Sequence, residues 1–351
     1  MLILTDRAMA RHEPGPAHPE RPARLEHLLG ALEREGHYIQ HPRRAEDADL
    51  TRFHTRAYVE GILPMAGQRV SLDADTHLSP DSVDAALLAA GAALDAVDAV
   101  CRGDHQRAFA LVRPPGHHAE RDRAMGFCVF NNLAIAAEHA LAQHDVDRIL
   151  IVDWDVHHGN GTAHGFEDRA DVLVFNVHQS PLYPGTGRSS ELGTGAGEGL
   201  TINRPVPAGS GDAEVLAELE QHLLPAAKDF TPDLVLVHAG YDAHHRDPIG
   251  GLRMTREGYR AMATLVRAIA EEQERNKHPP GQRPVSEEER QAVLVKLDAR
   301  KLELERDLAR LPMRFDTLAV KNRRAEIEKE MSEVEEAHRR FSVKKQLYVP
   351  M

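Results

Sequence analysis

The chain has 351 residues and a formal net charge of −12, with 43 lysines and arginines against 55 aspartates and glutamates. That length allows two domains, and the negative charge argues against a general nucleic-acid binder, which needs a basic surface for phosphates. The two cysteines, Cys101 and Cys128, are too few for a disulfide framework.

The N-terminal residues show no basic stretch followed by an apolar one, so no secretory signal is visible. No apolar run approaches the ~18 residues that a membrane span requires. We therefore expect a soluble protein of the cytoplasm, or of the nucleus or cilium if the source is eukaryotic.

Short apolar runs of strand length alternate with helix-like stretches along the first 270 residues. In chain order, we expect a helix at 21–35, a helix at 82–100, a strand at 109–112, a helix at 133–143, strands at 149–152 and 172–177, a helix at 213–224, a strand at 234–237 and a helix at 255–272. Strands that are apolar on both faces are typical of a parallel sheet covered by helices. This alternation predicts an α/β domain, whose ligands bind beyond the carboxyl ends of the strands.

Polar clusters follow three of these strands directly, so we expect all three clusters at the same edge of one sheet. They lie at 113–118, 153–161 and 239–243. Because side chains alternate along a strand, Asp153, Asp155 and His157 are expected to project to one side. Asp155, His157 and Asp242 would then form a metal site of two carboxylates and one imidazole, with positions open for water and substrate.

Each cluster has a simpler explanation when it is taken alone. A His-His pair is more often a structural polar group than a catalytic one, and acidic residues at strand ends often cap the next helix. The presence of all three clusters at strand ends favours the metal site. The glycine-rich segment 185–199 does not begin a helix after a strand, so we interpret it as a surface loop and reject a dinucleotide fingerprint.

The composition changes near Glu272, because residues 271–351 contain one of the 25 glycines and two of the 22 histidines. The Pro-Pro-Gly stretch at 279–281 stops a helix. The expected organisation is a first domain at 1–272, a linker at 273–285 and a helical tail at 286–351.

The tail has the pattern of two helices, and the first begins at a capping box from Ser286 to Glu289. Each helix carries an apolar stripe. The stripes consist of Leu294, Leu297, Leu304, Leu308 and Leu311 in the first helix, and Ile327, Met331, Val334 and Phe341 in the second. A break around 312–316 predicts an antiparallel hairpin or a coiled-coil arm. A solvated charged helix explains the charge but not the spaced leucines, so a binding or dimerisation surface is favoured.

Six segments of the first 270 residues resemble the zinc-dependent histone deacetylase family, in that family's order. They are HPERPARL at 18–25, RPPGHHA at 113–119, GFCVFNNLAIAA at 126–137, DWDVHHGNGT at 153–162, LYPGTG at 182–187 and AGYDAHHRDPIGG at 239–251. Asn160 and the absence of a Trp before His117 resemble the class II branch and the bacterial acetoin-utilisation and acetylpolyamine amidohydrolase enzymes. The resemblance implies an arginase/deacetylase-like three-layer fold with a central parallel sheet, and hydrolysis of acetyl-lysine or acetylated polyamines.

The resemblance also implies a role for each matching position. Asp155, His157 and Asp242 would bind Zn²⁺, although these ligand types suit Fe²⁺ as well. The implied catalytic residues are His118 as general base, His117 as its electrostatic partner, and Asp153 and Asn160, which orient the two imidazoles. Asp153 would also help to hold a structural monovalent cation. The implied substrate-binding residues are Gly126, Phe127 and Tyr183 in an acyl-lysine tunnel, with 12–21 and 73–75 near its rim.

Two features qualify that function. An arginase-like hydrolase with two Mn²⁺ ions is the alternative in the same architecture, but it needs an aspartate where this sequence has Gly159. No Gly-Gly-Tyr follows Asp242, and the resemblance stops near Glu272, so the domain is expected to be incomplete at its C-terminal end. In the family that tyrosine donates to the developing oxyanion, and losing one such donor costs ~10²–10³ in turnover. We therefore expect reduced or absent catalysis, with a catalytically impaired metal-binding protein or adaptor as the alternative function.

The tail resembles the C-terminal domain of enkurin, a ciliary adaptor associated with calmodulin and channel binding. The matching segments are PVSEEER at 284–290, Leu-Pro and Phe-Asp-Thr within 311–317, Lys-Asn-Arg-Arg at 321–324 and the closing Leu-Tyr-Val. This resemblance and the apolar stripes imply a protein partner or self-association through the tail. The negative charge and the lack of a long apolar run predict no direct contact with nucleic acid or a membrane.

Overall fold

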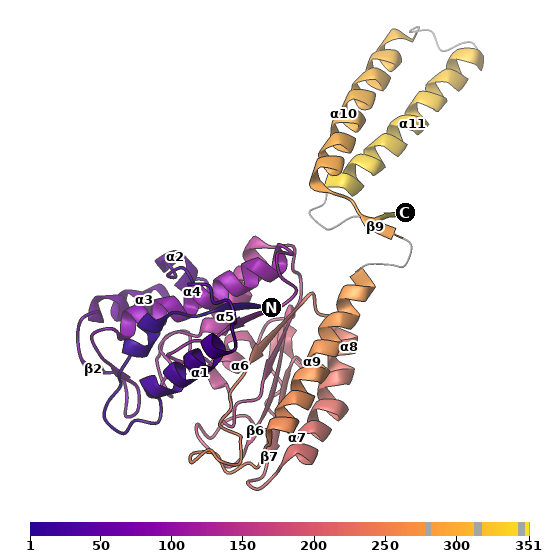
Figure 1. Ribbon diagram of the computed structural model, residues 1–351. Helices are drawn as coiled ribbons and strands as arrows, with labels where there is room; N and C mark the ends of the chain where they lie inside the picture. The colour runs from indigo at the N-terminus through magenta and orange to yellow at the C-terminus, as the bar shows by residue number, and fades with distance from the viewer. Residues whose placement is uncertain (278–281, 312–317, 343–347, 351) are drawn as a thin grey trace. The chain divides into compact units, whose positions relative to one another are not determined.

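The computed structural model describes residues 1–277, 282–311, 318–342 and 348–350 (Figure 1). It divides into two compact units, Met1–Gln273 and Glu274–Met351, which we describe one at a time. In the part of the chain that is described, no helix has the length and apolar character needed to cross a membrane.

The first unit alternates helices and strands along the chain. Its strands are β1 (Leu2–Leu4), β2 (Val70–Ser71), β3 (His77–Leu78), β4 (Ala108–Ala110), β5 (Ile149–Asp153), β6 (Val172–Gln179), β7 (Thr201–Val206) and β8 (Leu234–His238). Its helices are α1 (Pro22–Arg34), α2 (Asp47–Leu50), α3 (Arg56–Ile62), α4 (Ser82–Cys101), α5 (Asn132–Gln143), α6 (Asn160–Phe166), α7 (Asp212–Glu218), α8 (Leu224–Phe230) and α9 (Arg256–Lys277). Every strand and helix expected between residues 21 and 272 has a counterpart here.

A four-stranded parallel sheet in the order β7-β6-β5-β8 forms the centre of this unit. In its register, Asp153 at the end of β5 lies opposite Asn176 of β6 and His238 of β8. The carboxyl ends of these strands therefore meet at one edge of the sheet, as the sequence predicted.

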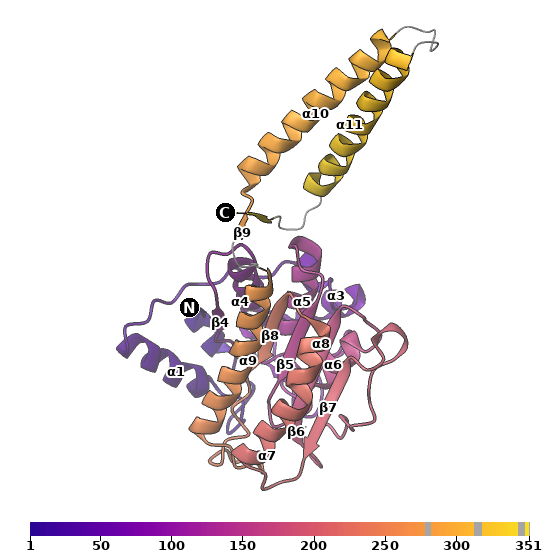
Figure 2. The same ribbon diagram turned by 90° about the vertical axis from the view of Figure 1, so that its right-hand side faces the viewer.

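Helices cover both faces of the sheet, which makes three layers. Alternate residues of β5 and β6 point to opposite sides: Ile149, Ile151, Val172 and Val174 join a core with α4 and α5. Leu150, Val152, Leu173 and Phe175 join a second core with α7, α8 and α9, which cover the face turned toward the viewer in Figure 2. Burial on both faces explains why β5 is apolar along its whole length.

Several expected elements differ in extent from the observed ones. The helix expected at 213–224 continues through a π-helical turn, Leu219–Leu223, into α8, and α9 runs to Lys277 rather than to 272. The strand expected at 109–112 ends at Ala110 and pairs with β1 in a separate two-stranded parallel sheet. The expectation that all three polar clusters leave strands of one sheet is thus wrong for the first cluster among the described residues.

The sequence did not predict β1 or β7. β7 is a strand at the edge of the sheet, and it contains Asn203, Arg204 and Pro205. Polar residues and a proline are tolerated at such an edge, where one side of the strand needs no ladder hydrogen bonds. Because of these residues, β7 lacks the apolar run by which the other strands were recognised.

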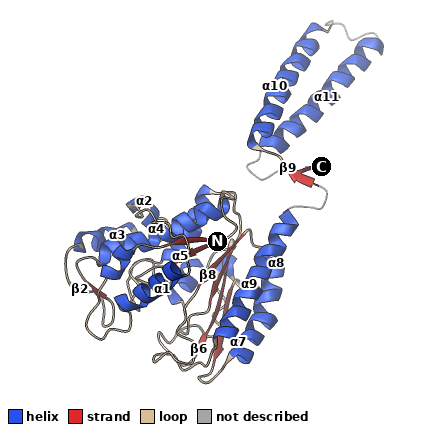
Figure 3. Ribbon diagram, in the orientation of Figure 1, coloured by secondary structure: helices blue, strands red, loops and turns tan. Residues whose placement is uncertain are grey.

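The second unit contains two long helices and a short antiparallel strand pair (Figure 3). Its helices are α10 (Glu287–Arg310) and α11 (Leu318–Ser342), and its strands are β9 (Gln282–Pro284) and β10 (Tyr348–Pro350). The capping box at Ser286 and Glu289 is confirmed, because each side chain bonds the other residue's backbone N–H. Leu304, Ile327 and Val334 form a small buried core between the helices. The break expected at 312–316 lies outside the described residues.

Candidate metal and catalytic site

The chain turns at once where β5 ends. The backbone N–H of Asp155 donates to Asp153 Oδ1 at 3.0 Å, and that of His157 donates to Asp155 Oδ1 at 2.9 Å. The strand alternation expected for Asp153, Asp155 and His157 therefore does not hold, because β5 stops at Asp153. Instead, the turn sends the two aspartates into two separate groups of potential ligands.

The first group consists of Asp155, His157 and Asp242, whose ligand atoms lie within 4.8 Å of one another. His157 Nδ1 lies 2.9 Å from Asp155 Oδ1 and 3.0 Å from Asp242 Oδ2. Asp242 is also oriented by the backbone N–H of Val156, which donates to its Oδ1 at 2.9 Å. Two carboxylates and an imidazole that converge in this way are donors suited to a divalent transition-metal ion.

The charges of this group favour a bound cation. Burial opposes the charged form of His157, but its hydrogen bonds to Asp155 and Asp242 raise the pKa of His157 to about 10. Burial and the charge of Asp155 raise the pKa of Asp242 to about 6. Two partly buried carboxylates thus share the positive charge of one imidazolium, and a divalent cation bound there would take over that role.

The histidine pair lies beside this group, and each ring is fixed by a different acceptor. His117 Nδ1 lies 2.8 Å from Asp153 Oδ2, and His118 Nδ1 lies 2.7 Å from Asn160 Oδ1. The two rings are 4.0 Å apart between centroids, and His117 Nε2 lies 3.9 Å from Asp155 Oδ1. The segment after β4 therefore brings both imidazoles to the carboxylates after β5.

His118 is built to be neutral. The amide oxygen of Asn160 can only accept, so the hydrogen of His118 is on Nδ1 and its Nε2 keeps a lone pair. Burial and the neighbouring His117 hold the pKa of His118 well below its usual range. A buried neutral imidazole with a free nitrogen is the form that a general base requires.

Asp153 also faces a histidine that the sequence reading missed. The ring of His238, the last residue of β8, stacks on His117 at 4.2 Å with an interplanar angle of 1°, and its Nδ1 lies 3.5 Å from Asp153 Oδ1. Burial acts against the charge of His238, but Asp153 raises the pKa of His238 to about 9. The signal was present, since His238 directly follows the apolar run at 234–237.

The expected monovalent cation beside Asp153 remains a prediction. Asp153 Oδ2 is bonded to His117, and Oδ1 accepts from the backbone of Asp155 and faces His238. Burial works against ionisation, but His117 and His238 lower the pKa of Asp153. An anionic Asp153 is a suitable oxygen ligand for a monovalent cation. The side-chain contacts that the structure gives for Asp153 are with His117 and His238.

The three expected tunnel residues lie next to the histidine pair or are linked to it. The ring of Tyr183 lies edge-on to His118 at 5.1 Å and to His157 at 6.3 Å, and the side chain is partly exposed. Phe127 packs edge-on against His18 at 4.7 Å. Gly126 has φ +56°, and a Cβ on it would lie 2.3 Å from His118 Cδ2. Only glycine lets the backbone run this close to the imidazole.

The two rim segments meet beside Phe127. His18 Nε2 lies 3.2 Å from the backbone oxygen of Asp75, and Phe127 N–H donates to Thr76 Oγ1 at 3.1 Å. A fully buried ion pair anchors the first rim segment, because Arg113 donates to both carboxylate oxygens of Glu20, at 2.5 and 2.6 Å. This pair was not predicted, although both residues lie within the recognised motifs.

A further carboxylate supports Asn160 from behind. The amide nitrogen of Asn160 donates to Glu120 Oε1 at 2.5 Å, and His164 Nδ1 lies 3.0 Å from the same oxygen. Burial opposes the charge of Glu120, but His164 and Asn160 lower the pKa of Glu120. Nothing in the sequence spacing indicated that Glu120 reaches Asn160, so this contact was missed.

Comparison with protein families gives two matches along the chain. Residues 18–278 match the model of the histone deacetylase domain. Residues 260–345 match the enkurin model, which is described as calmodulin-binding.

Relatives of the first unit come from archaea, bacteria and plants. A "Probable deacetylase" of Archaeoglobus fulgidus is 40% identical over 267 residues, which are 74% of each chain. "Histone deacetylase 10, chloroplastic" of Oryza sativa is 38% identical over 295 residues, 78% of this chain and 66% of that one. A "Histone deacetylase-like amidohydrolase" of Pseudomonas aeruginosa is 41% identical over 230 residues, 65% of this chain and 60% of that one.

A solved structure, that of the HDA15 HD domain, superposes on this chain with a TM-score of 0.74. The two are 36% identical, and the match covers 77% of this chain and 80% of the other. The three-layer architecture is therefore that of a histone deacetylase domain.

Proposed function

The chain belongs to the histone deacetylase family, and from that membership we propose that it is a metal-dependent amide hydrolase acting on acetylated lysine side chains or acetylated polyamines. The observation that supports this most is the juxtaposition of two unlike groups. The Asp155–His157–Asp242 trio offers metal ligands, and His118 beside it is neutral with Nε2 free. Amide hydrolysis needs both an electrophile and a base at one place.

The chain's residues divide the chemistry among them. Asp155, His157 and Asp242 would hold a divalent cation, Zn²⁺ or Fe²⁺ by ligand type, which would supply Lewis acidity for a water molecule and for the amide carbonyl. His118 accepts a proton at Nε2 from the attacking water as the water oxygen bonds to the amide carbon, and it returns that proton to the amine nitrogen as the C–N bond breaks. Asn160 keeps His118 in the required tautomer, and the Asp153–His117 pair keeps a second, oriented imidazole beside it.

Tyr183, Phe127 and Gly126 are proposed to line the passage for the acetylated chain. Tyr183 lies edge-on to His118, the proposed base, and to His157, a proposed metal ligand, and its side chain is partly exposed. It therefore reaches from the solvent to the proposed base. Burial and the charge of Asp75 raise the pKa of Tyr183, which keeps its hydroxyl protonated. A neutral aromatic wall suits the apolar methylenes of lysine and of a polyamine alike.

Turnover is proposed to be low. The sequence has no Gly-Gly-Tyr after Asp242, and in the resembled family that tyrosine supplies a hydrogen bond to the oxyanion. One missing donor of this kind costs about 10²–10³ in turnover. The alternative function is a metal-binding protein with little catalysis that acts as an adaptor through its second unit, and the enkurin match of residues 260–345 favours it.

The second unit is proposed to bind a protein partner. The printed description of the matching family points to calmodulin, and self-association of the helical hairpin is the other option. Titration of the full chain with calmodulin, with and without Ca²⁺, separates these options. A cytoplasmic location likewise stays a prediction of the sequence.

Zinc content and turnover, measured together, test the enzymatic proposal. We expect about one zinc per chain at the trio and slow hydrolysis of a fluorogenic acetyl-lysine peptide. His118→Ala should abolish turnover and leave the zinc at the trio, because His118 is not a ligand. His105→Ala, an exposed histidine, is the matched control and should leave turnover unchanged. Zinc binding without any turnover would overturn the enzyme and retain the adaptor.

A further inference from the structure

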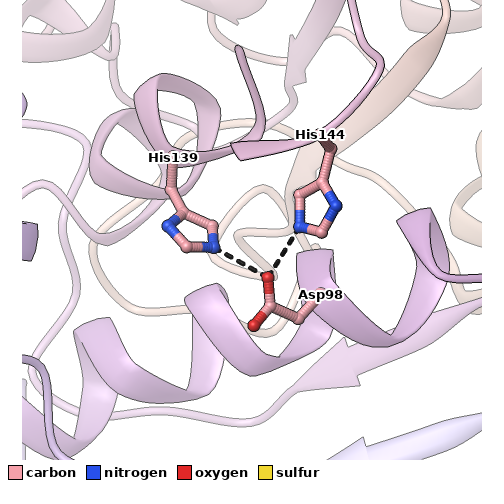
Figure 4. A group of neighbouring side chains, drawn as sticks. All are labelled: Asp98, His139 and His144. Carbon is pink, nitrogen blue, oxygen red and sulfur yellow. Dashed lines mark hydrogen bonds and ion pairs between the residues drawn. The ribbon is translucent and has the colours of Figure 1, made fainter. Parts of the chain in front are cut away.

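A second histidine-carboxylate group lies away from the site just described, between α4 and α5 (Figure 4). Asp98 comes from α4, His139 from α5, and His144 is the residue that caps the C-terminus of α5. The nitrogens His139 Nε2 and His144 Nε2 each lie 2.7 Å from the same oxygen, Asp98 Oδ1. Three potential ligand atoms therefore converge on one point.

The end of α5 explains how two histidines five positions apart reach one carboxylate. Residues at that spacing do not lie on the same face of a continuous helix. The helix stops at Gln143, and His144 has an extended backbone with φ −122° and ψ 167°. That change of direction turns the ring of His144 back toward α4, so that it meets His139 at a ring distance of 5.7 Å.

A hydrogen-bonded clamp is the simpler explanation of this group. In it, both imidazoles are neutral, each donates its Nε2 hydrogen to Asp98, and no metal is needed. Burial opposes the charge of Asp98, but its bonds with the two histidines lower the pKa of Asp98. The clamp accounts for the contacts, but it does not require both Nε2 atoms to face a single oxygen.

The Asp155–His157–Asp242 trio, the proposed metal ligands, can be compared with this second group. In the trio, one imidazole nitrogen lies 2.9 and 3.0 Å from two carboxylate oxygens. In the second group, one carboxylate oxygen lies 2.7 Å from two imidazole nitrogens. In each group, one ligand atom lies within hydrogen-bond distance of the other two, and all ligand atoms lie within 4.8 Å of one another. Their side chains are also similarly accessible, at 9–17% exposed for the second group and 13–16% for the trio.

We propose that Asp98, His139 and His144 form a second divalent-cation site, of the zinc class, that fastens the C-terminal end of α5 to α4. Two imidazoles and a carboxylate leave one position of a tetrahedron for water, which the partial exposure of the group admits. Asp98 Oδ2 pairs with Arg102, 2.9 Å away and largely exposed, so Oδ1 remains as the ligand atom. This site is independent of the proposed deacetylase activity.

The second site is expected to bind more weakly than the trio. His139 Nδ1 is buried and has no hydrogen-bond partner among the described residues. When a metal takes Nε2, the ring hydrogen moves to Nδ1, and a buried donor without an acceptor is unfavourable. The trio therefore fills first, and the second site fills with the next equivalent of Zn²⁺.

Zinc titration of the full chain tests the proposal. The protein, freed of metal by a chelator, is titrated with Zn²⁺ by calorimetry, and the metal retained after desalting is measured by mass spectrometry. The wild type should bind two zinc ions per chain, and Asp98→Asn should bind one. Asparagine keeps the shape of the side chain and an oxygen that accepts from both histidines, so the clamp survives while the anionic ligand is lost.

Two further variants make the result decisive. His144→Gln removes a ligand at the end of the helix, and it should also bind one zinc ion even if Asp98→Asn fails to fold. His222→Gln is the matched control, because His222 lies 3.6 Å from the carboxylate of Glu218 in an ordinary surface pair, and it should bind two. Wild type, Asp98→Asn and His144→Gln that all bind equally would overturn the second site and leave a hydrogen-bonded clamp.

Failure of the deacetylase proposal gives a different pattern. Asp155→Asn should lose the zinc of the trio and all turnover, yet keep one zinc ion at the second site. If the wild type binds two zinc ions and has no turnover, only the enzyme proposal fails. If it turns over substrate with one zinc ion, only the second site fails.

Discussion

The two imidazoles of the histidine pair differ because different acceptors stand behind them. His117 faces the carboxylate of Asp153, whereas His118 faces the neutral amide of Asn160. An amide fixes the position of a ring hydrogen without adding a negative charge, so it selects a tautomer and leaves the ring neutral. Adjacent residues of one type thereby acquire different roles.

The amide of Asn160 is itself ambiguous, because its oxygen and nitrogen ends have similar shapes. A carboxylate only accepts, so Glu120 must receive the NH₂ end, and the oxygen must then face His118. We therefore propose Glu120 as a positioning residue for His118, the proposed base, acting through Asn160 and two hydrogen bonds away from the ring.

Replacement of Glu120 by glutamine should make the orientation of the Asn160 amide variable. The glutamine amide both donates and accepts, so the orientation of Asn160 and the tautomer of His118 are no longer dictated. We expect kcat to fall about tenfold, as is common for the outer partners of metal sites, with little change in KM or zinc content. Steady-state kinetics and metal analysis measure this, and ¹⁵N NMR reports the tautomer of His118.

His164→Gln is the control for that prediction. It removes the outer partner of Glu120, 3.0 Å from the same oxygen, but it leaves the bond between Glu120 and Asn160 in place. Its kcat should stay near that of the wild type. An equal fall of kcat in Glu120→Gln and His164→Gln would contradict the prediction. It would mean that the charges of Glu120 and His164 matter, and not the orientation of Asn160.

At the scale of elements, strand register and helix packing bring distant residues together. The β5–β8 register sets Asp153 opposite His238, and the loop after β8 brings Asp242 to the turn after β5. In the second unit, the apolar stripe places Leu304 against Ile327 and Val334, while Lys301 and Glu335 pair at 2.9 Å. Among the described residues of this hairpin the buried contacts are few, so single side chains carry much of its stability.

Leu304→Ala should therefore destabilise the hairpin. Leu304 is 1% exposed, and truncation of a buried leucine costs about 2–5 kcal/mol. We expect a clear loss of helical circular dichroism, or a lower melting midpoint, in a fragment comprising residues 280–351. Leu302→Ala is the matched control on the same helix, since Leu302 is 49% exposed, and it should change stability by about 0.5 kcal/mol or less. A wild-type fragment without helical signal would contradict an independently folded hairpin.

At the scale of the whole molecule, buried histidines make the first unit sensitive to acid. Burial lowers the pKa of both His12 and His54 to about 4, while an unfolded histidine titrates near ~6.5. Between these values the unfolded chain binds protons that the folded one does not. The stability that these two neutral histidines contribute is therefore complete above about pH 6.5 and is lost as the pH drops toward 4.

Urea denaturation at pH 7.5 and pH 5.0 measures this effect. Trp154 is the single tryptophan and is buried in the first unit, so its fluorescence reports the unfolding of that unit alone. At pH 5.0 each of the two histidines should cost on the order of 2 kcal/mol, which lowers the urea midpoint. An unchanged urea midpoint would contradict this prediction, because it would mean that His12 and His54 take up protons in the folded protein as readily as in the unfolded chain.

Much of the first unit could be predicted because burial on both faces leaves a simple pattern. The runs of β5 and β6 and the helices α4 and α5 are apolar enough to be recognised without structural knowledge. β7 was missed because an edge strand needs no such run, and β1 because it has only three residues. The strand at β4 was found, but its hydrogen-bond partner depends on contacts that no local pattern encodes.

The sequence by itself determined the alternation of strands and helices, the clusters at their ends and the family to which they belong. These properties follow from periodicity and from residue types that only a few environments tolerate. The tertiary structure alone decided which of those polar residues meet. It separated Asp153 from Asp155 at a turn, stacked His238 on His117, set Glu120 behind Asn160 and joined Asp98 to two histidines. Hydrogen bonds and charge interactions act over a few ångströms in space, and the fold, not the spacing along the chain, sets those distances.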